Sequence, residues 1–125
     1  MSNQLAVLFP GIGYHIDKPL LYYSAKLARA RGYDLLAVQY PALPTGLRGH
    51  AEKIEQAVQT ALSAAEEQLT AIDWTAYDRV FFLSKSIGTA IAARYAVQHN
   101  IHPRQVYYTP IEQALPYLDP TGIAF

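Results

Sequence analysis

Short apolar runs alternate with longer amphipathic segments along the whole chain, and this alternation constrains the fold more than any other feature. The strand-like runs lie at residues 5–9, 34–40, 79–83, 105–109 and 123–125. The longest segment between them, about 49–72, has apolar residues at the three- and four-residue spacing of a helix. The alternation predicts an α/β fold with a mostly parallel sheet and helices on both faces. We expect about five strands in the order 2-1-3-4-5.

Helix and turn signals support this division of the chain. Pro19 suits the first turn of a helix, with Asp17 or Lys18 as its cap, and Gly32 is typical of the residue that follows a helix. A third helix is expected from Ile87 to about His99. Only a weak helical turn, at residues 111–115, is expected between the fourth and fifth strands.

Composition excludes several classes of function. The 125 residues predict one domain, 1–125, and 51% of them are apolar. Ten basic residues balance ten acidic ones, so we expect no nucleic-acid partner, and the absence of cysteine excludes disulfides and thiolate metal sites. No apolar run approaches the roughly 18 residues that span a membrane, and the N-terminus does not resemble a signal peptide. We therefore expect a cytoplasmic protein with no membrane partner.

Two unusual loops follow the first and third strands. In open parallel sheets, ligands bind beyond the carboxyl ends of the strands, where the strand order reverses. With the order 2-1-3, the reversal lies between the first and third strands. The loop at residues 10–14 and the turn at residues 84–88 are therefore expected to face each other across a crevice.

The turn after the third strand has the spacing of a serine nucleophile elbow. The pattern G-x-S-x-G reads here as Ser84-Lys85-Ser86-Ile87-Gly88. Small residues lie two positions before and two positions after the candidate nucleophile Ser86. The backbone N–H of Ile87 is the expected first oxyanion donor, and that of Ile12 the second. The candidate substrate-binding residues come from the facing loop and are Gly11, Gly13, Tyr14 and His15.

Several stretches, taken in order, carry a resemblance to a known family. They are Leu8-Phe-Pro-Gly-Ile-Gly-Tyr14, Asp17-Lys-Pro-Leu-Leu-Tyr-Tyr23, Arg31-Gly-Tyr33, Tyr40-Pro41, Phe82-Leu-Ser-Lys-Ser-Ile-Gly-Thr89 and Tyr107-Tyr-Thr-Pro-Ile-Glu112. Together they resemble the small bacterial α/β-hydrolases, which are serine hydrolases. The resemblance implies an acid after the next strand and a histidine near the end of the protein. About two further βα units of roughly 30 residues each would complete that pattern, so we expect the chain to be truncated before them.

Each candidate residue also has a simpler interpretation. Ser86 suits a helix N-cap, and Ser84 suits close packing. Lys85 as a base for Ser86, His15 as a general base and Glu112 as the catalytic acid are weaker interpretations, and Glu112 fits a capping carboxylate better. No histidine pair has metal-ligand spacing, and position 16 lacks the third glycine of a dinucleotide-binding loop. We expect neither a metal nor a cofactor.

Two functions remain open at this point. The first is hydrolysis of an ester, thioester or amide of a small-molecule substrate, with Ser86 as the nucleophile. The alternative is a non-catalytic doubly wound module that binds a small anion or a partner with the N–H groups of the same crevice. The exposed edge at the fifth strand favours a homodimer.

Overall fold

A five-stranded parallel sheet forms the centre of the molecule. The computed structural model describes residues 3–11, 19–44, 46–47 and 49–125. Within them the strands are β1 (Gln4–Phe9), β2 (Asp34–Ala37), β3 (Arg79–Lys85), β4 (Arg104–Tyr108) and β5 (Ile123–Ala124). Their order is β2-β1-β3-β4-β5, and every neighbouring pair is parallel. Both the predicted fold class and the predicted strand order are confirmed.

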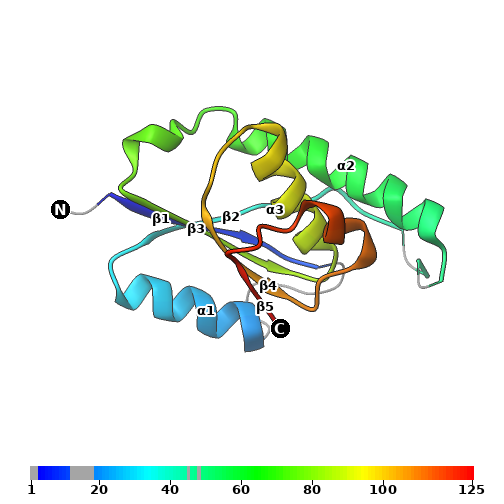
Figure 1. Ribbon diagram of the computed structural model, residues 1–125, viewed down its shortest axis with the longest axis horizontal. Helices are drawn as coiled ribbons and strands as arrows, with labels where there is room; N and C mark the ends of the chain where they lie inside the picture. The colour runs from blue at the N-terminus through cyan, green and yellow to red at the C-terminus, as the bar shows by residue number, and fades with distance from the viewer. Residues whose placement is uncertain (1–2, 12–18, 45, 48) are drawn as a thin grey trace.

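Helices cover both faces of this sheet (Figure 1). Helix α1 (Pro19–Ala30) lies on one face, and α2 (Ala51–Leu69) and α3 (Ile87–Gln98) lie on the other. Two short 3-10 helices, η1 (Trp74–Ala76) and η2 (Glu112–Tyr117), complete the described elements. No helix among the described residues is both long enough and apolar enough to cross a membrane.

The strand β1 is buried on both faces, as its continuous apolar run predicts. Side chains alternate along a strand, so Leu5, Val7 and Phe9 join the larger core under α2 and α3. Ala6 and Leu8 join the smaller core under α1. The long apolar spacing of α2 likewise faces the larger core with its buried residues, Ala57, Val58, Ala61, Leu62, Ala65 and Leu69.

Several element boundaries differ from the predicted ones, and two of them are explained by a distant side chain and by a glycine conformation. The second strand ends at Ala37 instead of Tyr40, because the backbone of Gln39 bonds to a side chain in place of a neighbouring strand. Its N–H donates to Gln68 Oε1 at 2.8 Å, and Gln68 Nε2 donates to its carbonyl. The helix predicted at 49–72 begins at Ala51 and follows Gly49, which has a left-handed φ of 80°.

Candidate functional site

The turn from β3 to α3 is as sharp as the elbow pattern predicts. Ser86 has φ 54° and ψ −122°, a backbone conformation that residues other than glycine rarely adopt. Its backbone N–H donates to the carbonyl of Tyr108 at 2.9 Å, which ties the turn to the end of β4. Such strain persists only where the surrounding structure holds it, and it is concentrated at functional sites. Ser86 itself is partly exposed.

The hydroxyl of Ser86 does not cap the helix that it precedes. Ser86 occupies the N-cap position of α3, but its side chain makes no capping hydrogen bond to the described residues. Its carbonyl instead accepts from the backbone N–H of Thr89 at 2.9 Å and from the Thr89 hydroxyl at 2.6 Å. The capping interpretation of this serine therefore has no support in the described contacts.

Gly88 brings the helix α3 into direct contact with the end of β1. A Cβ atom at this position would lie 2.0 Å from the carbonyl oxygen of Phe9 and 2.7 Å from that of Pro10. The first turn of the helix therefore touches the beginning of the loop after β1. The described contact reaches Pro10, and Gly11 is buried. That the two loops face each other beyond this point stays a prediction.

The other residues predicted in the facing loop lie outside the described residues. They are Ile12, Gly13, Tyr14 and His15. The second oxyanion donor and the substrate contacts assigned to them therefore stay predictions. Ile87 is described: it is the first residue of α3, and its side chain is buried. Backbone N–H groups in the first turn of a helix have no acceptor within the helix. The N–H of Ile87 is therefore of the kind that can donate to an oxyanion.

The serine two residues before Ser86 is a packing residue, as predicted. Ser84 is completely buried and lies opposite Phe9 in the pairing of β3 with β1. Its hydroxyl donates to the carbonyl of Val106 at 3.3 Å. A larger side chain would have to displace the strands on both sides, which explains why the pattern needs a small residue here.

Lys85 extends toward the end of the neighbouring strand. Its ammonium donates to the Thr109 hydroxyl at 2.8 Å, and Thr109 has a left-handed φ of 47°. Two residues with positive φ, Ser86 and Thr109, therefore follow adjacent parallel strands. This contact gives Lys85 a role in holding the turn after β4 and adds no support to its interpretation as a base.

Two of the described histidines lie at the far end of α3 from Ser86. His99 is the C-cap of the helix, and its Nε2 lies 3.2 Å from Glu66 Oε2. His102 lies beyond it, just before β4. Because α3 has 12 residues and rises about 1.5 Å per residue, neither side chain is within reach of Ser86. No cluster of three or more metal-ligating side chains exists among the described residues.

Glu112, the weaker candidate for the acid, lies beside the beginning of α2. It is exposed and shares a groove with Ala51, Glu52, Glu55, Gln56 and Gln113. Among the described residues it makes no hydrogen bond that would mark it as a cap or as the partner of a base. The capping role preferred for it from the sequence is therefore without support.

Sequence reasoning missed an ion pair that anchors the segment after β4. Arg94, in the buried helix α3, donates to both carboxylate oxygens of Glu55 at 2.6 and 2.7 Å. It also donates to the carbonyl of Gln113, and its guanidinium lies 4.9 Å from the ring centroid of Tyr117. The hydrogen bond from Arg94 lowers the pKa of Glu55 below its usual value. A single arginine in an alanine-rich helix was the available signal.

The second overlooked group is the hydroxyl of Tyr40. It is buried and has no hydrogen-bond partner among the described residues. Burial raises the pKa of this phenol, so it stays protonated. Buried polar groups are normally paired, which makes this hydroxyl an exception in the loop after β2.

Comparison with known proteins adds one solved structure. Neither a protein-family model nor a curated protein sequence matches this chain. A crystal structure from Xanthomonas campestris pv. campestris, described as a candidate hydrolase of the alpha/beta superfamily, is similar with a TM-score of 0.59 and 19% identity. The similarity covers 97% of this chain and 65% of that one. At this identity it shows the fold, which is that of the α/β hydrolases.

Proposed function

We propose that this protein is a serine hydrolase that acts on an ester, thioester or amide of a small molecule, with Ser86 as its nucleophile. One observation carries the proposal. Ser86 has a left-handed φ of 54° on a strand-to-helix turn, the residue is partly exposed, and its side chain makes no capping hydrogen bond to the described residues. A serine that served only to begin a helix would adopt ordinary extended backbone and bond its hydroxyl to the first turn.

In the proposed reaction, Ser86 Oγ attacks the carbonyl carbon of the substrate while a general base takes its proton. The carbonyl electron pair moves onto oxygen, where the N–H groups of Ile87 and Ile12 and the amino end of α3 stabilise the negative charge. Collapse of this intermediate expels the alcohol, thiol or amine, which leaves with the proton. Water then hydrolyses the acyl-serine and restores the hydroxyl. These steps need no cofactor, and we propose that they take place in the cytoplasm.

The general base and its acid are the untested part of this mechanism. The resemblance implies that an aspartate and then a histidine follow the strand that corresponds to β5. This chain spans 65% of the length of the similar Xanthomonas protein. The proposal is therefore tested both on this chain and on any longer product of the same gene.

The test is labelling with a fluorophosphonate, followed by mass mapping of the modified peptide. We expect the label on Ser86 and expect its loss in Ser86→Ala. Ser84→Ala is the matched control, since Ser84 is buried and its hydroxyl bonds to Val106, so this variant is expected to keep the label. Labelling only in a longer product would place the base outside these 125 residues.

The absence of labelling in every form would refute the nucleophile role of Ser86. Measured affinity for phosphate or carboxylate that survives Ser86→Ala would then support the non-catalytic module instead. In that case the N–H groups at the beginning of α3 would bind an anion without any chemistry at the serine.

A further inference from the structure

A groove of about 600 Å³ lies beside α1, on the face of the sheet opposite α3. Its position follows from how α1 is held on the sheet. Leu21 is completely buried, and the Ser24 hydroxyl lies 2.8 Å from that of Tyr108, which fastens one flank of the helix toward β4. The groove lies along the other flank, between α1 and strands β1 and β2. The lining residues are Leu8, Tyr22, Ala25, Lys26, Arg29, Leu35 and Ala37.

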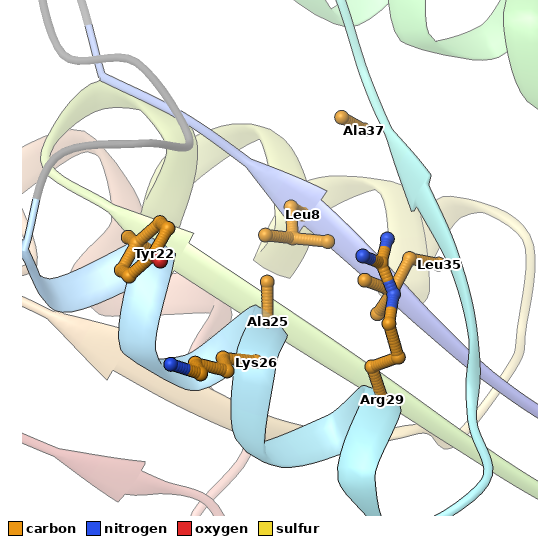
Figure 2. Close-up of a pocket in the computed structure, with 7 residues that line it drawn as sticks. All are labelled: Leu8, Tyr22, Ala25, Lys26, Arg29, Leu35 and Ala37. Atoms are coloured by element: carbon orange, nitrogen blue, oxygen red, sulfur yellow. The ribbon is translucent and has the colours of Figure 1, made fainter.

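The groove combines an apolar floor with a cation at one end (Figure 2). Leu35 and Ala37 of β2 are half-buried and supply aliphatic surface, whereas Leu8 of β1 borders the groove but is itself buried. Figure 2 shows the guanidinium of Arg29 reaching from α1 to the side of Leu35, while the ammonium of Lys26 turns the other way, toward Tyr22. The Lys26 ammonium lies 6.0 Å from the Tyr22 ring centroid.

Arg29 has a charge that no carboxylate in the described part of the chain neutralises. The ion pairs between described residues join Arg94 to Glu55 and His99 to Glu66, and neither involves Arg29. A planar guanidinium forms two parallel hydrogen bonds with one carboxylate. A phosphate dianion would be favoured by converging cations, and Lys26 and Arg29 diverge (Figure 2).

We propose that this groove binds a small amphipathic monocarboxylate. The carboxylate pairs with Arg29, and the apolar body covers the half-buried side chains of Leu35 and Ala37 in the direction of Tyr22. The groove is within the size range of small-molecule sites, roughly 300–1,000 Å³. Ser86 immediately precedes α3, and that helix lies on the other face of the sheet. The proposal is therefore independent of the proposed hydrolase activity.

Octanoate is the probe, and its binding is measured by amide NMR on the full chain. We expect saturable shifts at the amides of α1 and β2, and weaker binding of octan-1-ol, which has a similar body without the charge. Arg29→Gln is expected to weaken octanoate binding about fivefold, the upper end for a charge-assisted pair at an exposed arginine. Arg31→Gln is the matched control, since Arg31 is exposed and does not line the groove, and is expected to leave the affinity unchanged.

Two further variants distinguish binding in this groove from binding elsewhere on the protein. Ala37→Val adds methyl groups to the floor of the groove without changing charge, so it is expected to weaken octanoate binding. Ser86→Ala is expected to leave octanoate binding unchanged. Equal losses in Arg29→Gln and Arg31→Gln would overturn the proposal, as would shifts centred on the β3–α3 turn. Inorganic phosphate that binds the same amides as tightly as octanoate, or an octanoate titration with no saturable shift, would also overturn it.

Discussion

Replacing Gly88 by alanine tests whether contact between α3 and β1 builds the candidate site. The added methyl group would lie 2.0 Å from the Phe9 carbonyl oxygen and 2.7 Å from that of Pro10. Neither obstacle is a flexible side chain, so helix and strand must separate by roughly 1 Å, and overpacking of this kind costs about 1–3 kcal/mol. The better helix propensity of alanine returns about 1 kcal/mol. Because two backbone carbonyls are displaced, we take the upper end of that range, about 3 kcal/mol, and expect a net loss of about 2 kcal/mol.

Thermal unfolding followed by circular dichroism measures this loss. For a chain of this size we expect the Tm to fall by about 8 °C, and we expect labelling of Ser86 to be lost with the turn. Gly49→Ala is the control, because Gly49 has a φ of 80° but no atom within 4 Å of an added Cβ. It is expected to cost only the backbone strain, about 1 kcal/mol, and to keep the label. A Gly88→Ala protein with an unchanged or higher Tm would refute the close contact.

The remaining predictions concern a hydroxyl, an ion pair and the sheet edge. Tyr40→Phe removes a buried hydroxyl without a described partner, so we expect the free energy of unfolding, measured by urea denaturation, to rise by up to about 1 kcal/mol. A clear fall in that free energy would show that the hydroxyl is hydrogen-bonded. Arg94→Met is expected to cost about 2 kcal/mol in the same assay, a value discounted because the Glu55 side chain is 36% exposed. The pKa of Glu55 is lowered in the folded protein, so its contribution is complete above the unfolded value of 4.5 and is lost as the pH falls through the lower folded-state value. The stability difference between wild type and Glu55→Gln should therefore shrink only in acid, and a difference that shrinks near neutral pH would contradict this. The expected homodimer at the β5 edge predicts a concentration-dependent mass in sedimentation that Ile123→Lys abolishes, and a monomer at every concentration would refute it.

The fold could be predicted because its signals are local. Each strand is a short apolar run, and the long helix α2 repeats apolar residues at three- and four-residue spacing, so neighbours in sequence carry the information. The boundaries were less certain where a distant side chain intervenes. Gln68 ends the second strand by bonding to Gln39, a contact across 29 residues that no local pattern indicates.

The candidate nucleophile could also be predicted, because the elbow needs small residues at fixed positions around Ser86. Whether this serine caps a helix or serves as a nucleophile could not be predicted from the pattern. Serine is common both as a helix cap and as a nucleophile, and only the backbone angles and the absence of a described capping bond favour the second role. The complete burial of Ser84 also could not be read from its neighbours in sequence, because it depends on pairing with strands β1 and β4.

By itself, the sequence determined the order of strands and helices, the sharp turn at Ser86 and the small residues around it, because these depend on side chains only a few positions apart. Tertiary structure alone decided that Gly88 touches Phe9 and that Arg94 pairs with Glu55. It also decided that Arg29 lines an apolar groove and forms no ion pair with a carboxylate of the described residues. Such contacts join residues that are distant in the chain. They exist only after the sheet has brought its strands together and each helix has settled at a particular place on its face.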